Sequence, residues 1–172
     1  MPEGMTTSPS GPPRADWRFV RAHPAHFIAF GFGAGLSPFA PGTAGTLLGF
    51  PLYALLARLP GRGYVLVAVA LVFALGVWAA GKTASALGVA DHGGICFDEI
   101  AAFLLILVFT PPSIAWFIAA FFVFRFFDVV KPYPIRYVDR KIKNGFGVMF
   151  DDMLAAGYSV LVLKLGETLI HG

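Results

Sequence analysis

The chain has 172 residues and a net charge of +3, with 57% hydrophobic residues, only 13% charged residues and a mean hydropathy of +0.73. Soluble domains contain about 25% charged residues, so this composition predicts an integral membrane protein, and the length predicts a single domain. The basic residues form no nucleic-acid-binding motif, and the single cysteine, Cys96, excludes an internal disulfide framework and a cysteine-based metal cage.

The first 16 residues are rich in Pro, Ser, Thr and Gly, which predicts a disordered tail ahead of a domain at 17–172. This tail lacks the basic and apolar regions of a signal peptide. Residues 17–26 mix arginines with aromatic side chains, as in Trp17, Arg18 and Phe19. That mixture predicts a short helix at a membrane interface.

Residues 31–46 contain five glycines, two prolines and the hydroxyl residues Ser37, Thr43 and Thr46. This content predicts an irregular, re-entrant or site-lining loop, which membranes tolerate only where protein or water satisfies the backbone. Such a loop could offer Thr43, Thr46 and backbone N–H groups to a phosphate. The alternative is close helix packing, because G-x-x-x-G pairs occur at 31/35 and 45/49.

Apolar runs after this loop predict an all-α membrane protein, a compact bundle of about four to five transmembrane or re-entrant helices with a Gly/Pro-rich loop. A spanning helix needs about 20 residues, so the first run is short and either spans or only dips into the bilayer. The five runs are residues 47–59, 64–80, 100–110, 114–130 and 153–170.

Five crossings would place ten basic residues on the side of the N-terminal tail and three on the other side. The positive-inside rule then predicts that the tail side is cytoplasmic. Every acidic residue except Glu167 falls on that side as well. Because acidic residues contribute little to orientation, their gathering indicates a functional site.

The acidic residues form three clusters along the chain. Helix capping could explain one member of a pair that precedes an apolar run, but Asp128 lies near the end of its run, where a negative charge is unfavourable. A carboxylate at membrane depth costs about 2.5–3.5 kcal/mol, whereas a pair with Arg125 returns only about 0.2–0.5 kcal/mol. The clusters are Asp91/Asp98/Glu99, Asp128/Asp139 and Asp151/Asp152.

A bound divalent cation explains these carboxylates better than isolated ion pairs. Carboxylates that leave coordination positions to water and phosphate are typical of Mg²⁺ sites. We therefore predict that Mg²⁺ is held by the carboxylates that also serve in catalysis, with Arg125 and Asp139 in supporting roles. The predicted ligands are Asp98, Glu99, Asp128, Asp151 and Asp152.

Basic residues follow the second acidic cluster directly. Lys131, Arg136 and Arg140 lie in a segment restrained by two prolines and are predicted to hold a phosphate, while the lysines after them are attracted to anionic headgroups. Acids for a metal beside bases for a phosphate favour phosphoryl chemistry. His92, beside Asp91, could assist as an acid or base, or could simply belong to a turn.

Four blocks of this sequence resemble the phosphatidylglycerophosphatase A family, in the family's order. They are GLSPFAPGTAGT at 35–46, DHGGICFDE at 91–99, FRFFDVVKPYPIRYVDR at 124–140 and GFGVMFDDMLAAG at 145–157. The resemblance implies a multi-pass enzyme of the bacterial inner membrane, surrounded by bilayer lipids, with its active site on the cytoplasmic face. It also implies Mg²⁺-dependent hydrolysis of phosphatidylglycerophosphate to phosphatidylglycerol and phosphate in phospholipid biosynthesis. The nucleophile, either water or a carboxylate, stays open, as do the number of metal ions and the oligomeric state.

Two other functions remain as alternatives. A phospholipid-synthesising alcohol phosphotransferase would also be helical and metal-dependent, but its D-G-x2-A-R-x8-G-x3-D-x3-D motif is absent. A small ion-binding transporter would place charges near mid-membrane and on both faces. The one-sided acidic clusters argue against the transporter.

Overall fold

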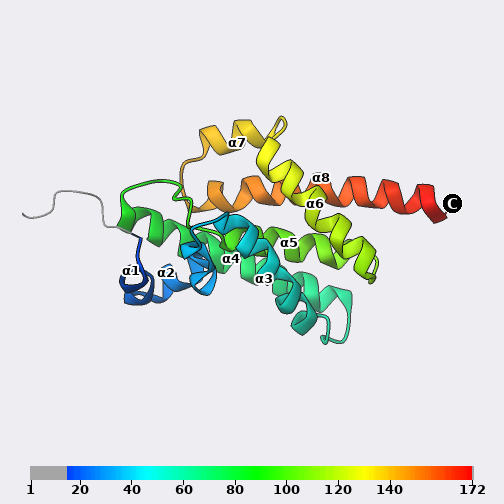
Figure 1. Ribbon diagram of the computed structural model, residues 1–172, viewed down its shortest axis with the longest axis horizontal. Helices are drawn as coiled ribbons and strands as arrows, with labels where there is room; N and C mark the ends of the chain where they lie inside the picture. The colour runs from blue at the N-terminus through cyan, green and yellow to red at the C-terminus, as the bar shows by residue number, and fades with distance from the viewer. Residues whose placement is uncertain (1–14, 172) are drawn as a thin grey trace, which may run out of the picture.

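The computed structural model describes residues 15–171 and is entirely helical over that range, as predicted (Figure 1). Of the predicted tail, only Ala15 and Asp16 belong to the described residues. The elements are α1 (Trp17–Ala22), α2 (Pro24–Ala29), the 3-10 helix η1 (Gly31–Leu36), α3 (Pro41–Leu56), α4 (Arg62–Leu87), α5 (Phe97–Phe109), α6 (Ile114–Val130), α7 (Ile135–Lys141) and α8 (Gly145–His171).

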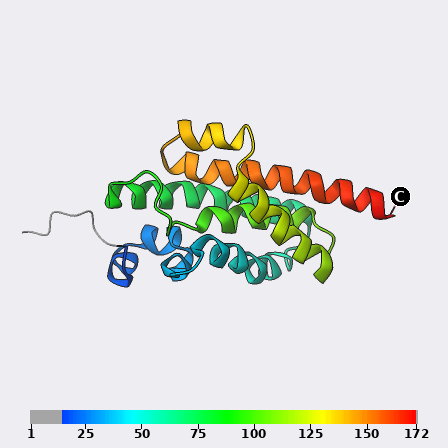
Figure 2. The same cartoon turned by 45° about the horizontal axis from the view of Figure 1, so that its top comes forward.

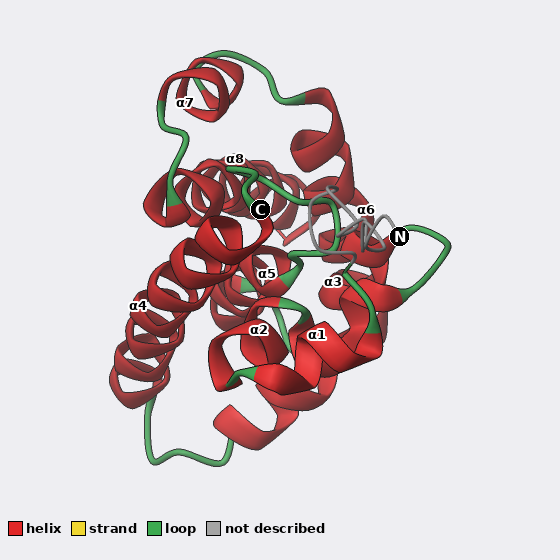
Figure 3. Ribbon diagram, turned by 90° about the vertical axis from the view of Figure 1, so that its left-hand side faces the viewer, coloured by secondary structure: helices red, strands yellow, loops and turns green. Residues whose placement is uncertain are grey.

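Helix α5 forms the centre of the bundle. It packs against α3, α4, α6 and α8 (Figure 2). A helix that is apolar on all sides belongs in a core, and α5 is buried on every side through residues such as Ile100, Phe103, Leu104 and Leu107. Viewed end-on, the other long helices surround it (Figure 3).

Two helices, α4 and α8, are long and apolar enough to cross a membrane in the described part of the chain. The runs predicted at 64–80 and 153–170 lie inside them, and the run at 114–130 coincides with α6. Helices α3, α5 and α6 have 16, 13 and 17 residues, fewer than the about 20 that a straight crossing needs. The predicted helices therefore exist, while the predicted number of crossings stays a prediction.

The irregular loop predicted at residues 31–46 is shorter than predicted, because helix α3 already begins at Pro41. Residues 31–36 do contain left-handed backbone, at Phe32 and Gly33. From Pro41 onward, however, the chain forms the first turns of α3, with the proline at a position where its missing N–H costs nothing. Gly45 and Gly49 face Cys96 and Phe103 so closely that a Cβ would collide with them. The packing interpretation therefore holds for the 45/49 pair.

Two further boundaries differ from the predicted ones. The predicted interfacial helix at 17–26 is split, because Pro24 begins a separate helix, α2. Helix α8 begins at Gly145, well before the predicted 153. There Asn144 Oδ1 accepts a hydrogen bond of 3.0 Å from the N–H of Gly147 and serves as a helix cap.

The connections gather at the two ends of the bundle. The α3–α4 and α5–α6 turns and the C-terminus lie at one end, and α1, α2 and the first turns of α5 and α8 lie toward the other (Figure 1). We call the second of these the site end, because Asp98 and Glu99 lie in the first turn of α5 and Asp151 and Asp152 lie near the start of α8. The number of membrane crossings and the side on which each connection lies stay predictions.

Helix α8 offers a matched pair of glycines that tests its close packing on α4. A Cβ at Gly145 would collide with the backbone of Val77 and Gly81, whereas a Cβ at Gly157 meets nothing within 4 Å. Overpacking costs about 1–3 kcal/mol, so Gly145→Ala should lower the thermal unfolding temperature in detergent. Gly157→Ala should leave it unchanged or raise it, since alanine favours helix by about 1 kcal/mol over glycine. Equal shifts in both variants would contradict the close α4–α8 contact.

Candidate functional site

The site begins at the first turn of α5. Asp98 is buried there, and the Glu99 side chain is only 13% exposed. Asp98 Oδ1 accepts a hydrogen bond of 3.1 Å from the N–H of Glu99. Carboxylates are favourable at a helix N-terminus because unpaired N–H groups and the helix dipole face them. The dipole therefore helps to hold two adjacent negative charges inside the protein.

A third carboxylate, Asp152, reaches this pair from α8. One oxygen from each of Asp98, Glu99 and Asp152 lies within 4.8 Å of the other two. Among the described residues, Glu99 Oε2 and Asp152 Oδ2 have no hydrogen-bond partner, although both atoms are buried. Unpaired buried oxygens are costly, and three converging carboxylates are a suitable donor set for Mg²⁺. These residues fit the predicted ion.

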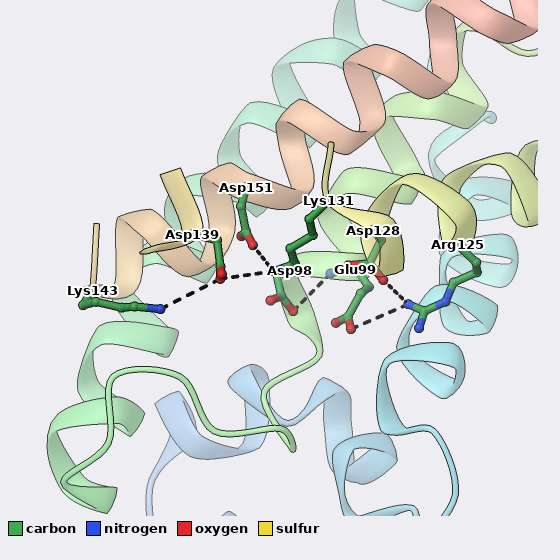
Figure 4. A network of polar contacts seen from close by, with 8 residues as sticks. All are labelled: Asp98, Glu99, Arg125, Asp128, Lys131, Asp139, Lys143 and Asp151. Carbon is green, nitrogen blue, oxygen red and sulfur yellow. Dashed lines mark hydrogen bonds and ion pairs between the residues drawn. The ribbon is translucent and has the colours of Figure 1, made fainter. Parts of the chain in front are cut away.

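The end of α6 brings Asp128 and Arg125 to the same cluster. Arg125 Nη1 lies 2.6 Å from Asp128 Oδ2 and 3.8 Å from Glu99 Oε1 (Figure 4). The pairing of Arg125 with Asp128, which their spacing of three residues allows, is present in the structure. It is a contact of opposite charges and not an aligned hydrogen bond. Arg125 also balances part of the charge of Glu99, which connects α6 to α5.

Lys131 connects the end of α6 to Asp139 of α7 and Asp151 of α8. Its backbone is left-handed (φ 45°), and its N–H donates to Phe127 O at 2.9 Å, which ends α6 where predicted. The ammonium group pairs with Asp151 and lies 3.2 Å from Asp139 Oδ1 (Figure 4). Burial opposes its charge, but these contacts outweigh burial and raise the pKa of Lys131 above its ordinary value. Lys131 is thus a firmly held cation.

Asp151 and Asp152 contact different residues because they point in different directions from α8. Consecutive residues of a helix point about 100° apart. Asp151 therefore faces Lys131, while Asp152 faces the start of α5. Both lie inside the helix, beyond its Asn144 cap, so the capping interpretation is excluded for this pair.

One contact of the site was not predicted from the sequence. A Cβ at Gly42 would overlap Glu99 Oε1, so the first turn of α3 lies directly against that carboxylate. The glycines of residues 31–46 indicated close packing, but the sequence does not show that Gly42 contacts Glu99. Thr46 is buried and its hydroxyl donates to Gly42 O at 3.0 Å, while Thr43 is half-buried. Their predicted contact with phosphate stays a prediction.

The remaining predicted residues lie further out. Arg136 and Arg140 are exposed on α7 and line a cavity of about 510 Å³ together with Lys131. Asp91 is exposed, and His92 Nδ1 accepts a hydrogen bond of 3.0 Å from the N–H of Gly94, as a turn residue does. The structure gives no ion pair for Asp91 among the described residues.

Comparison with known proteins provides independent information. Residues 27–167 match the model of the family described as Phosphatidylglycerophosphatase A. A Haemophilus influenzae protein of that name is 48% identical over 82% of this chain and 87% of its own length. The Escherichia coli K12 protein of that name is 40% identical over 92% of both chains. A Bacteroides thetaiotaomicron protein, provisionally named a phosphatidylinositol-3-phosphatase, is 40% identical over 83% of this chain and 93% of its own. No solved structure matches.

Replacing Lys131 tests its place in the site. Lys131→Met would leave Asp151, whose side chain is 6% exposed, without its cation. Breaking a buried ion pair by removing one partner costs about 3 kcal/mol or more, so the unfolding temperature should fall clearly. Lys143→Met is the matched control, because Lys143 is half-exposed and its ammonium lies as far as 4.0 Å from Asp139 Oδ1, which makes a weak ion pair. Thermal unfolding in detergent measures both, and a shift as small for Lys131 as for Lys143 would contradict this ion pair.

Proposed function

Since the chain belongs to the phosphatidylglycerophosphatase A family, we propose that it hydrolyses the terminal phosphate of phosphatidylglycerophosphate in a Mg²⁺-dependent reaction. The family is one of phosphatases acting in phospholipid biosynthesis, and the products here are phosphatidylglycerol and phosphate. The observation that supports the metal most strongly is the convergence of Asp98, Glu99 and Asp152, two of whose oxygens lack partners within the described residues.

Asp98, Glu99 and Asp152 would hold the Mg²⁺, with Asp128 and Asp151 beside them. When bound, the ion supplies Lewis-acid polarisation of phosphoryl oxygens and activation of water. The protein contributes the fixed positions of its carboxylates. Arg125 restrains Asp128 and Glu99, and the dipole of α5 favours the negative charge at its first turn.

Lys131 provides positive charge for the terminal phosphate from its place beside Asp151. Lys131 lies between the carboxylate cluster and the cavity lined by Arg136 and Arg140. A phosphate that enters from this cavity meets a charged ammonium before it reaches the carboxylates. Charge stabilisation of this kind carries much of the catalysis of phosphoryl transfer.

We further propose that the protein is a multi-pass protein of the bacterial inner membrane with the site end at the cytoplasmic face. Exposed apolar side chains recur every four residues along α6, at Ile114, Ile118, Phe122 and Phe126. Exposed leucines and valines follow the outer sides of α4 and α8 as well. Such continuous apolar surface suits contact with lipid.

Phosphate release by purified protein in detergent tests the reaction. Phosphatidylglycerophosphate should be hydrolysed with Mg²⁺, and EDTA should abolish release. Asp152→Asn should lower kcat by about 100-fold or more, as the loss of a preorganised charge does. Phosphatidylinositol 3-phosphate is the comparison substrate, because one relative carries that activity in its provisional name.

Glu167→Gln is the control for this assay. Glu167 lies near the far end of α8, where it pairs with Lys164, so this variant should keep wild-type activity. Absence of Mg²⁺-dependent phosphate release from the wild type would refute the proposed function. Full activity of Asp152→Asn would remove Asp152 from the metal site.

Cysteine labelling tests the orientation in the membrane. Gly63 and Gly93 are exposed, and a Cβ added at either would meet nothing within 4 Å, so cysteine fits at both. Gly93→Cys at the site end should react with an impermeant maleimide only in inverted vesicles, and Gly63→Cys only in intact spheroplasts. The wild type gives the background, since Cys96 is buried. Labelling of both variants from the same side would contradict the proposed topology.

A further inference from the structure

The cavity beside Lys131 is a basic pocket on the outside of the carboxylate cluster. It has a volume of about 510 Å³ and lies between α7 and the turn that follows α6. We call it the α7 pocket. Its lining is Val130, Lys131, Pro132, Tyr133, Arg136, Tyr137, Arg140 and Lys141.

The cations of the α7 pocket differ in how their charge is balanced. Lys131 pairs with Asp151 and Asp139. Arg136 donates to the Val130 carbonyl at 3.1 Å, and none of Arg136, Arg140 and Lys141 has a carboxylate partner among the described residues. The pocket therefore carries uncompensated positive charge, which suits an anionic ligand.

The pocket is also held in place by neighbouring elements. Ile135 is fully buried and fixes the start of α7 on the bundle. The Tyr158 hydroxyl of α8 donates to Tyr133 O at 3.0 Å, which secures the turn between α6 and α7. The arginines follow one face of α7, four residues apart. A ligand thus meets a preformed arrangement of charges and not a loose surface lysine cluster.

Lys131 belongs to both the carboxylate cluster and the α7 pocket. A ligand with two phosphate groups could therefore place one at the carboxylates and the other among the α7 arginines. We propose that the α7 pocket binds the internal phosphodiester of the lipid substrate, so that Arg136 and Arg140 select lipids carrying both a terminal phosphomonoester and a phosphodiester. This inference rests on the proposed function and adds the part of the substrate that determines specificity.

Arginine suits this role because its planar guanidinium donates two parallel hydrogen bonds to phosphate oxygens. Phosphatidic acid has a terminal phosphomonoester but no phosphodiester, so it would reach the carboxylates without filling the α7 pocket. Each hydrogen bond to a charged group contributes about 10-fold or more to binding. Loss of the two arginines should therefore affect the two lipids very differently.

The test compares kcat/KM for phosphatidylglycerophosphate and phosphatidic acid in micelles of an uncharged detergent. The double variant Arg136→Gln/Arg140→Gln should lose about 10- to 100-fold or more in kcat/KM for phosphatidylglycerophosphate. Its kcat/KM for phosphatidic acid should stay within about twofold of the wild type. An equal loss for both lipids would overturn the proposal, because the arginines would then serve the terminal phosphate.

The control variant is Arg18→Gln/Arg21→Gln, which removes the same charge from α1 at the site end. Neither arginine lines the α7 pocket, so this variant should keep the wild-type preference. The measurements are repeated in vesicles that contain the anionic lipid phosphatidylserine. A defect of the α7 variant that occurs only in those vesicles would assign the pocket to bulk anionic lipid and overturn the proposal.

A binding measurement separates failure of this inference from failure of the proposed function. Phosphatidylglycerol carries the phosphodiester without the terminal phosphate, and it is added to micelles of uncharged detergent. It should raise the unfolding temperature of the wild type and of Arg18→Gln/Arg21→Gln, but not of the α7 double variant. If the wild type hydrolyses neither lipid yet shows this shift, the proposed reaction is wrong, while the proposed phosphodiester binding in the α7 pocket is supported. If no variant differs in the shift, the pocket assignment is wrong.

Discussion

The burial of negative charge at the first turn of α5 is the constraint on which the rest of the structure depends. Five carboxylates from three helices lie at or near this turn, and among the described residues only Arg125 and Lys131 pair with them directly. Buried carboxylates need opposite charge or hydrogen bonds. These carboxylates therefore lack enough positive charge to balance them. The excess of negative charge, together with two unpartnered oxygens in the described structure, is the physical reason for placing a cation at Asp98, Glu99 and Asp152.

Close helix packing is what allows this concentration of charge. Gly42 brings the start of α3 against Glu99, Gly45 lies against Cys96 just before α5, and Gly49 lies against Phe103 within α5. Small residues at helix contacts provide close van der Waals packing where the hydrophobic effect gives little, as in lipid. The site is therefore stabilised by the apolar bundle beneath it, because the acidic groups themselves repel.

Much of the fold could be predicted from the sequence, since hydrophobic runs determine helices and Lys131-Pro132 determines where α6 ends. The acidic clusters were also visible, because so few charges occur elsewhere. Residues 41–46 were misjudged, since glycine and proline disfavour an isolated helix but suit one that starts at Pro41 and packs closely. The start of α8 was missed for the same reason: two glycines and two acids conceal a helix that tertiary contacts, among them those with α4 and Lys131, stabilise.

The unequal lengths of the helices determine how deep the site lies. At a rise of 1.5 Å per residue, the 26 residues of α4 extend about 39 Å and the 13 residues of α5 about 20 Å. Helix α4 therefore passes the start of α5 at the site end, and residues 88–96 return the chain to it (Figure 2). The carboxylates at that start are recessed from the end of the bundle. For a protein embedded as proposed, this recess corresponds to the headgroup region, where a lipid phosphate reaches Lys131 while its acyl chains stay in the bilayer.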